Sequence, residues 1–468
     1  MATDPADFSA TDLLAAYRTK RLSPVEATRA VLARVEALNP VLNCFCLVDA
    51  DFALATARES EARWMRGEPR GLVDGVPTSI KDLLYTKGWP TLRGSKTIDP
   101  KGPWNDDAPA VARLREHGAV LFGKTTTPEF GWKGVTDNPL TGITRNPWNP
   151  AMTSGGSSGG AAAAVASGMG PLAMGTDGAG SIRIPCTFCG IPGLKPSFGR
   201  VPAFPLSPFG TVAHLGPMAR STEDLALMLT VISRPDARDW TSLPGEPRDY
   251  RVGLCDGVRG LRVAFSPDLG YVRNVDPEVA ASVRAAARVF AALGAHVDEV
   301  APGFADPEEI TTKLWFVGSL TVASSLTPDQ LALTDPALRW QADEGRKISV
   351  LELQKLLLRR GELGSSMRLF HQRYDLLLTP GVSVPAFAAR AAGEWELALD
   401  KFLGWTPFSY PFNLTQQPAA VVPCGLARSG LPIALQIVGP MHADALVLRA
   451  ARAYESTREW KFPGAASA

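Results

Sequence analysis

Apolar and polar residues recur along the chain with the spacing of helices and short strands. In residues 22–40, LSPVEATRAVLARVEALNP, apolar side chains return every three or four positions and therefore share one face of a helix. Ser23 is a suitable N-cap for this helix, and Glu26 completes a capping box with it. The helix is expected to end at Asn39-Pro40.

Residues 106–124 and 275–300 each predict a helix followed by a strand. In the first segment a helix begins at Pro109 and stops at Gly118, and a buried strand covers Ala119–Phe122. The second segment has Asp276 as its N-cap, Gly294 as its stop and an apolar face of Val279, Val283, Ala286, Phe290 and Leu293.

Three further apolar runs predict short strands: LRVAFS (261–266), DLLLTP (375–380) and PIALQIVGP (432–440). Helices that alternate with such strands are typical of α/β layering, in which helices cover a mostly parallel or mixed central sheet. Residues 234–260 are rich in proline, aspartate and glycine, so they are expected to form either a surface excursion or a joint between domains.

The composition is that of a folded protein with a small-molecule partner. Of the 468 residues, 45% are hydrophobic and 20% are charged, which excludes a disordered chain. Lys and Arg (48) balance Asp and Glu (47), so neither nucleic acid nor an acidic membrane is an expected partner. Three aspartates stand among the first twelve residues, where an export signal would be basic and apolar. A cytoplasmic protein is therefore expected.

The cysteines are expected to be packed, reduced thiols. They are too sparse for a disulfide scaffold, and the CTFC pair (186–189) has redox spacing without a second pair or a thioredoxin-like setting. The six are Cys44, Cys46, Cys186, Cys189, Cys255 and Cys424.

Two catalytic motif matches fail in their context. GAVLFGKT (118–125) satisfies the phosphate-loop pattern, but its middle is the expected strand and no helix opens after it. GSSGG (156–160) matches a nucleophile elbow centred on Ser158, yet the proline-containing stretch RNPWNPAMTSG (145–155) is not expected to form the strand that leads into an elbow. Such a serine also needs a histidine, and surface or capping positions are expected for His117, His214, His296, His371 and His442.

The segment PLAMGTDGAGSIRIP carries the strongest chemical signal. A strand over Leu172–Gly175 leads into a loop in which Gly178, Ala179 and Gly180 precede Ser181. Small residues let successive backbone N–H groups converge on one point, and such convergence stabilises an oxyanion. The glycines therefore serve close approach rather than flexibility.

With these motifs the sequence resembles the amidase signature family. The signature appears as GGSSGG, GTDGAGSIRIP and CGIPGLKPSFGRV, and the likeness extends to GVPTSIKDLLYTKG, GKTTTPEFG, HLGPMARSTEDLA, LLLTPGVSVPAF and PAAVVPCGLARSGLPIALQIVGP. These motifs spread from about Ser23 to about Glu455. The family hydrolyses amides with a Ser/cis-Ser/Lys triad and no metal. The resemblance therefore implies that Ser181 is the nucleophile, Ser157 the cis-peptide serine and Lys81 the base.

The chemistry of these residue types fits the implied roles. A serine hydroxyl must lose its proton as it attacks, and a lysine accepts that proton only when neutral. Lys81 ends the apolar run VPTSI, where burial would lower its pKa toward working pH. The Ser157 hydroxyl both donates and accepts, so it would relay the proton between Lys81 and Ser181. The expected oxyanion hole consists of the backbone N–H groups of Gly178, Ala179, Gly180 and Ser181.

Two motifs depart from the family pattern. GTDTGGS reads GTDGAGS here, which puts Ala179 where a glycine is usual, and NLTGQPA reads NLTQQPA, which puts Gln416 there. Ala179 bears on the oxyanion loop, and Gln416 is expected to bear on the pocket.

The sequence does not identify the substrate-binding residues. Some aromatic residues outside the signature are expected to line an apolar pocket and at least half to be core: Trp132, Trp315, Phe316, Trp340, Trp405, Phe408 and Tyr410.

The resemblance implies one large α/β domain over residues 1–468, with a helical segment at about 8–40, a signature core at about 70–220 and an α/β part at about 260–460. It implies a small-molecule amide substrate and no cofactor or metal, and a homodimer is compatible with it. Aliphatic and aryl amides, carbamates and esters all remain open, because each forms an oxyanion. Two rival functions are an amidotransferase subunit, which supplies ammonia for transfer RNA within a complex, and a catalytically dead binding protein, which would lack triad members.

Overall fold

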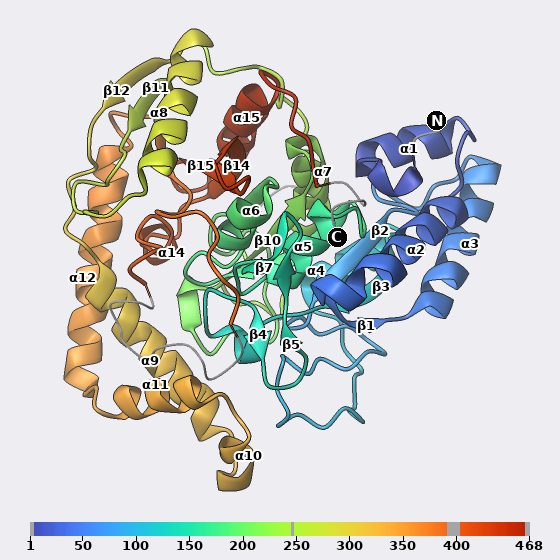
Figure 1. The fold of residues 1–468 in the computed structure, drawn as a ribbon, viewed down its shortest axis with the longest axis horizontal. Helices are drawn as coiled ribbons and strands as arrows, with labels where there is room; N and C mark the ends of the chain where they lie inside the picture. Colours follow the sequence, from blue (N-terminus) through green and yellow to red (C-terminus); the bar gives the residue numbers. More distant parts are fainter. Residues whose placement is uncertain (1–3, 245–247, 391–402, 464–468) are drawn as a thin grey trace.

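A mixed sheet of eleven strands forms the centre of the molecule (Figure 1). The computed structural model describes residues 4–244, 248–390 and 403–463. From one edge to the other, the strands are β1 (Phe45–Val48), β3 (Val120–Thr125), β2 (Pro77–Lys81), β8 (Leu172–Asp177), β10 (His214–Ala219), β9 (Gly193–Lys195), β14 (Ala419–Leu426), β15 (Pro432–Val438), β13 (Leu376–Pro380), β11 (Arg262–Phe265) and β12 (His296–Glu299). β2 pairs in parallel with β3 and β8, and β11 with β12 and β13, whereas the other neighbours are antiparallel. The predicted α/β fold with a mixed sheet is confirmed.

Helices cover both faces of this sheet. The α-helices are α1 (Ala10–Arg18), α2 (Pro24–Leu42), α3 (Ala50–Arg66), α4 (Pro109–Glu116), α5 (Gly159–Ala166), α6 (Arg183–Cys189), α7 (Thr222–Ile232), α8 (Pro277–Ala292), α9 (Glu308–Ser324), α10 (Pro328–Ala332), α11 (Pro336–Arg346), α12 (Val350–Phe370), α14 (Pro411–Leu414) and α15 (Asp444–Glu455). Short 3-10 turns are η1 (Pro5–Asp7), η2 (Glu129–Gly131) and η3 (Gly210–Val212). Side chains of α4, α7, α8 and α15 join one apolar cluster, and those of α2, α3, α5 and α6 join another.

Strand side chains alternate between these two clusters, as the pleat of a sheet requires. In β15, Leu435 and Ile437 belong to the first cluster and Ala434 to the second. The alanine-rich helix α5 is buried along its whole length, because Ala161–Ala166 let it pack closely on the sheet and on α6. The alanine run therefore belongs to the core.

The predicted helix at residues 22–40 is α2, and its capping box is present between Ser23 and Glu26. The helix continues to Leu42, two residues beyond the expected end. Pro40 is accommodated in the last turn, and Asn43 closes the helix with φ 52° by donating its N–H to Asn39 O at 2.8 Å. The left-handed asparagine ends the helix where the proline does not.

The other predicted helices and strands are present, with one correction. The strand expected at Ala119–Phe122 is β3, which runs on through Lys124 and Thr125, so residues 120–125 of the phosphate-loop match form a strand. The stretch 145–155, in contrast, does form strands: β6 (Arg145–Asn146) pairs with β7 (Asn149–Thr153) in a small ribbon outside the main sheet. The ladder pairs Arg145 with Thr153 and Asn146 with Asn149, so Pro150 lies in the irregular part between these pairs, where a proline is tolerated. A second ribbon consists of β4 (Asp137–Asn138) and β5 (Gly142–Ile143).

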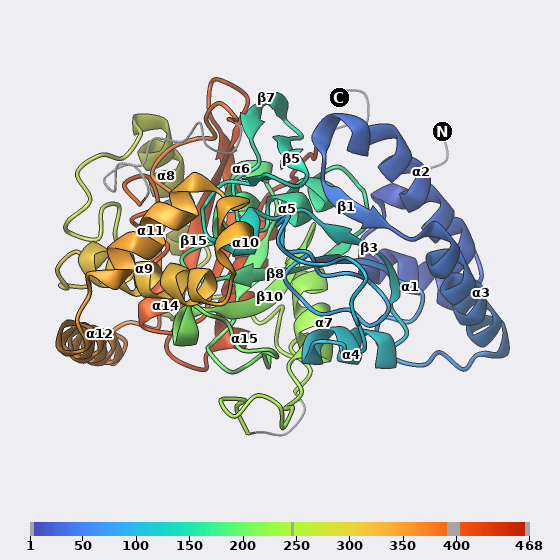
Figure 2. The ribbon, with the colours of Figure 1, turned by 90° about the horizontal axis from the view of Figure 1, so that it is seen from below.

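Helices α9, α10 and α11 lie together at one end of the molecule, at the lower left in Figure 1. Part of the segment between α7 and β11 projects from the body in Figure 2, whereas Tyr250, Leu254 and Val258 of the same segment are buried in the first apolar cluster. The segment therefore combines a surface excursion with residues of the core, and β11 after it belongs to the same sheet as the preceding strands. In the portion of the chain that the structure describes, no helix combines the length and apolar character needed to cross a membrane.

Candidate active site

The two serines of the GGSSGG stretch stand between β7 and α5. The Gly156–Ser157 peptide bond is cis, and Ser158 is the residue that precedes α5. A Cβ at Gly156 would lie 2.5 Å from the backbone of Val135, so only glycine fits at this position. The close approach fixes the path of the chain into Ser157.

Lys81 connects these serines to the central sheet. It is the last residue of β2, it is fully buried, and its Nζ lies 2.7 Å from Ser157 Oγ, 2.8 Å from Ser158 Oγ and 2.8 Å from Thr176 Oγ1. Burial lowers the pKa of Lys81 well below its ordinary value, and the charge of Asp177 opposes this only in part. The site thus favours a neutral amine.

The loop after β8 is held by the Asp177 carboxylate. Gly180 adopts φ 126°, which glycine tolerates, and its N–H donates to Asp177 Oδ1 at 2.7 Å. The Gly180 N–H is therefore engaged, whereas the sequence counted it among the oxyanion donors. Ala179 is not among the residues with positive φ, so its methyl group fits, and its carbonyl accepts a hydrogen bond from Ser409 Oγ at 2.8 Å.

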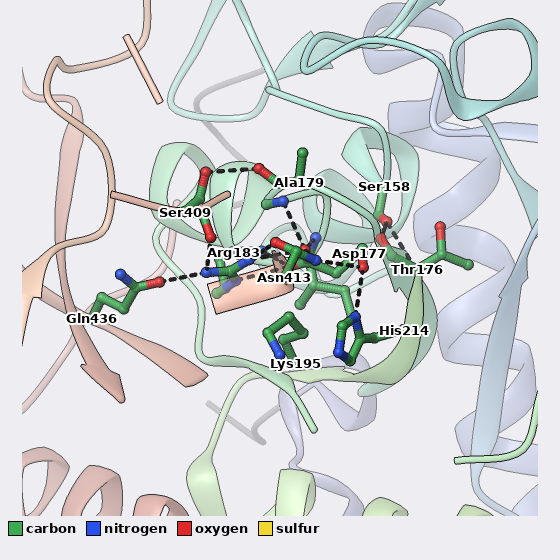
Figure 3. Close-up of polar contacts among 12 residues, drawn as sticks. Ser158, Thr176, Asp177, Ala179, Arg183, Lys195, His214, Ser409, Asn413 and Gln436 are labelled. Carbon is green, nitrogen blue, oxygen red and sulfur yellow. Dashed lines mark hydrogen bonds and ion pairs between the residues drawn. The ribbon is translucent and has the colours of Figure 1, made fainter. Parts of the chain in front are cut away.

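Arg183 holds the loop after β8 in place through the Asp177 carboxylate. Its Nε and Nη2 donate to the Asp177 carboxylate at 2.9 and 3.0 Å, and both side chains are fully buried (Figure 3). Burial raises the pKa of Asp177, but Arg183 outweighs it and holds that pKa below its usual value. The remaining guanidinium hydrogens go to Ser409 O, Gln436 Oε1 and Asn413 Oδ1. The buried ion pair of Arg183 and Asp177 therefore holds the loop in one conformation.

A cavity of about 270 Å³ opens onto these groups. Ser157, Thr176, Gly178 and Ser181 line it on the side of the signature. The opposite lining is mostly apolar and includes Leu83, Phe130, Val201, Leu206, Phe209 and Trp315. The cavity therefore combines a few convergent polar groups with apolar walls, as binding sites for small molecules do.

Other buried lysines have different surroundings. Lys124 Nζ donates to Leu84 O and Thr91 Oγ1 beside Asp82, and Lys195 Nζ donates to the carbonyl of Gln417. Lys133 is paired with Asp137 and Asp335. Of these four lysines, Lys81 is the one that contacts serine hydroxyls.

The histidines do not form a serine–histidine pair with Ser158. Ser158 Oγ donates to Thr176 O at 3.1 Å and lies beside Lys81. His214 is nevertheless neither a surface nor a capping residue, which corrects the expectation: it is buried on β10 and lines the cavity. Its Nδ1 lies 2.7 Å from Val212 O, and burial holds its pKa well below the ordinary value.

The cysteines are free thiols, but they are not all buried. Cys44, Cys186, Cys189 and Cys424 are packed inside, whereas Cys46 and Cys255 are exposed, contrary to the expectation. Burial raises the pKa of Cys186 and Cys189, which both lie on α6. The CTFC pair is therefore a helix-packing element. In the ranges that the structure describes, no three His, Cys, Asp or Glu side chains form a group that could hold a metal ion.

Most of the aromatic residues that the sequence offered as pocket candidates do not line the cavity. Of the seven, Trp315 lines the cavity, while Trp132, Phe316, Phe408 and Tyr410 are buried elsewhere. Gln416 has φ 64° and donates from Nε2 to Thr211 O at 2.9 Å, so it supports the cavity wall through Thr211. The sequence analysis missed Phe209 and His214 as pocket residues. Phe209 stands outside the recognised motifs, and nothing in HLGPMARSTEDLA marks His214, its first residue, as part of a pocket.

Known proteins match this chain over almost its whole length. A family model described as Amidase matches residues 26–448. The Acylamidase of Rhodococcus erythropolis is 38% identical over 460 residues, covering 97% of this chain and 96% of the relative. A Glutamyl-tRNA(Gln) amidotransferase subunit of Chloroflexus aurantiacus is 35% identical over 484 residues, covering 98% of both. The crystal structure of a bacterial aryl acylamidase matches with a TM-score of 0.89 at 33% identity, covering 96% of both chains.

Proposed function

This chain belongs to the amidase signature family and hydrolyses amide bonds, and on that premise we propose that Ser181 is its nucleophile, Ser157 its proton relay and Lys81 its general base. The observation that carries the proposal is the contact between the buried Lys81 amine and Ser157, on the floor of a cavity that Ser181 also lines. Small-molecule amides are the expected substrates.

The hydrogen bonds around Lys81 favour a base rather than a cation. Ser158 uses its hydroxyl hydrogen on Thr176 O, so it can only accept from Lys81. A neutral amine has two hydrogens and one lone pair. If the hydrogens go to Ser158 and Thr176, the lone pair is left for the Ser157 hydroxyl, 2.7 Å away. This arrangement makes Ser157 an acceptor for the proton of the nucleophile.

The relay continues from Ser157 to Ser181. Both residues line the same cavity, and a hydrogen bond between their hydroxyls is expected to form when a substrate is bound, as catalytic hydrogen bonds often do. The backbone N–H groups of Gly178, Ala179 and Ser181 are the proposed donors to the oxyanion. Gly180 is left out because its N–H is bound to Asp177.

The reaction then runs in two halves. Ser181 Oγ attacks the carbonyl carbon while its proton passes through Ser157 to Lys81, and the oxyanion is stabilised by the loop. The Lys81 ammonium returns the proton to the leaving nitrogen as the C–N bond breaks, which leaves an acyl-enzyme. A water molecule attacks the acyl-enzyme with the same relay and releases the acid and Ser181.

The apolar lining of the cavity favours amides with an apolar acyl or aryl group over glutamine. Esters and carbamates pass through the same oxyanion and are proposed as additional substrates. The relatives named for glutamyl-tRNA(Gln) amidotransferase suggest the rival function, which needs partner subunits. A homodimer is compatible with the hydrolase, whereas activity that depends on other subunits is not.

We expect the purified chain to hydrolyse N-acyl anilides without any other protein, because the proposed triad and cavity lie within this chain. The measurement is initial rates on a panel of anilides, aliphatic amides, esters, carbamates and glutamine. Ser181→Ala is the background control on every substrate. Glutamine hydrolysis that appears only after partner subunits are added, with no anilide turnover, would identify an amidotransferase component.

No single histidine should be essential. We expect each histidine-to-alanine variant to lose no more than about tenfold in kcat/KM, whereas a triad histidine would cost far more. His214→Ala is the most demanding case, because that side chain lines the cavity. Active-site titration corrects each rate for folded enzyme. A loss of several orders of magnitude at any of the five would overturn the lysine mechanism.

A further inference from the structure

Trp315 stands directly against the proposed oxyanion loop. It comes from α9, is 6% exposed, and lines the cavity together with Ser181. Its indole Nε1 donates to Trp132 O at 2.7 Å, which fixes the ring. A Cβ built on Gly178 would lie 3.0 Å from Cη2 and Cζ3 of this ring. The edge of the indole therefore rests on the first residue of the loop.

Phe209 supports the same ring from the other side of the wall. The two rings are stacked with centroids 4.1 Å apart and an interplanar angle of 23°. A Cβ on Gly318, one turn after Trp315 on α9, would lie 2.3 Å from Phe209 Cδ1. Phe209 is thus held between the indole and the backbone of α9, and it also lines the cavity.

Two glycines therefore make room for two rings. Gly178 admits the Trp315 edge and Gly318 admits Phe209: a Cβ at 318 would overlap the phenyl ring, and a Cβ at 178 would press against the indole. The family pattern GTDTGGS has threonine at the position of Gly178, and its Cβ would crowd the indole. The glycine and the tryptophan of this chain accordingly form a matched pair.

We propose that the stacked pair of Trp315 and Phe209 determines substrate selectivity by admitting a flat group beside the scissile carbonyl and excluding a puckered one. This inference rests on the proposed function of Ser181, since it places the wall beside that serine. The substrate class is an amide with an aryl group on the acyl or the amine side.

The physical basis is the rigidity of the wall. The indole is fixed by its hydrogen bond, by Phe209 and by the loop, so it does not move aside for a thicker group. A planar ring gains stacking with an aromatic wall, whereas a saturated ring of the same size needs more depth and gains no stacking. One extra or missing methylene group in an apolar pocket changes kcat/KM by about 10- to 200-fold.

The test compares flat and puckered rings on one enzyme preparation. The probes are a benzamide with the matching cyclohexanecarboxamide, and an anilide with the matching N-cyclohexyl amide. The ratio of kcat/KM within each pair is measured for the wild type and for Trp315→Leu. The intrinsic reactivity of the two substrates of a pair is the same for both enzymes, so it does not affect the comparison of their ratios. The fraction of folded enzyme is the same for both substrates in one preparation, so it does not affect the ratio either.

We expect Trp315→Leu to reduce the preference for the flat member by about tenfold in at least one pair. Trp340→Leu is the matched control, because Trp340 lies on α11 in the same group of helices and does not line the cavity. It should leave both ratios unchanged. Unchanged ratios in Trp315→Leu would overturn the proposal, as would an equal change in Trp340→Leu.

A second set of variants tests the contact itself. Gly178→Ala places a methyl group against the indole and should reduce kcat/KM on all substrates by about tenfold or more. Gly178→Ala/Trp315→Leu should recover most of that loss, because the shorter side chain leaves room for the methyl group. Additive losses would contradict the pairing of loop and wall.

Ser181→Ala separates the role of the nucleophile from the role of the aromatic wall. If Ser181→Ala retains turnover of the flat probes, the nucleophile assignment is wrong whatever the selectivity. If Ser181→Ala is inactive but Trp315→Leu keeps the wild-type ratios, the triad stands and the wall does not select.

Discussion

Ser181→Ala is expected to lose amide turnover by about five to six orders of magnitude, the scale of loss on removing a serine nucleophile. Without Oγ no acyl-enzyme forms, and the loop can only stabilise attack by water. The substitution removes a single oxygen from a side chain that lines the cavity, so the fold should be unaffected. The measurement is kcat/KM on an anilide and on an ester.

The matched control for this variant is Ser167→Ala. Ser167 is a buried serine at the end of α5 that donates its Oγ hydrogen to Ala163 O, and it does not line the cavity. It should retain wild-type turnover. Retained activity in Ser181→Ala, combined with loss in Ser158→Ala, would support the nucleophile elbow instead.

Lys81→Ala is expected to damage amide hydrolysis much more than ester hydrolysis. In acylation the neutral lysine accepts the proton of Ser181 through Ser157, and in the collapse of the intermediate it returns a proton to the leaving group. An amine leaves poorly unless it is protonated, whereas an aryloxide needs little help. We expect losses of about 10⁴-fold or more for the amide and about 10²-fold for a matched aryl ester.

The pH dependence follows from the same assignment. Burial lowers the pKa of Lys81 well below its ordinary value, so the amine is neutral above that lowered pKa and charged below it. Wild-type activity should therefore fall on the acid side, as protonation removes the lone pair. That limb should be absent from the residual esterase activity of Lys81→Ala, and Lys81→Met tests whether side-chain volume alone matters. Equal losses on both substrates with the acid limb retained would make Lys81 structural.

Elements governed by local rules could be predicted from the sequence. The helix α8 has the predicted cap at Asp276 and the predicted buried face, because N-capping and apolar periodicity act within a few residues. The predicted end of α2 at Asn39-Pro40 is wrong, because Asn43 in a left-handed conformation, rather than Pro40, closes the helix. The prediction missed the strand β7 because the exclusion of proline holds for regular central strands and not for a short ribbon with a register shift.

The candidate site divides in the same way. Lys81, Ser157 and Ser181 stand in motifs that the sequence displays, and the structure brings Lys81 and Ser157 within hydrogen-bonding distance. The engagement of the Gly180 N–H by Asp177 depends on the loop conformation, which no motif encodes. The cavity wall joins Gly178, Phe209 and Trp315 from three distant segments, so it follows only from tertiary packing.

The central claim, that Ser181 is the nucleophile, is tested most directly by locating a covalent label. The wild type is treated with a fluorophosphonate and cleaved before aspartate, which separates residues 137–176, with Ser157 and Ser158, from residues 177–223, with Ser181. Tandem mass spectrometry then assigns the modified residue. We expect a single phosphonylated serine, Ser181, and no label on the 137–176 fragment. A label on Ser158, or on any residue other than Ser181, would contradict the claim.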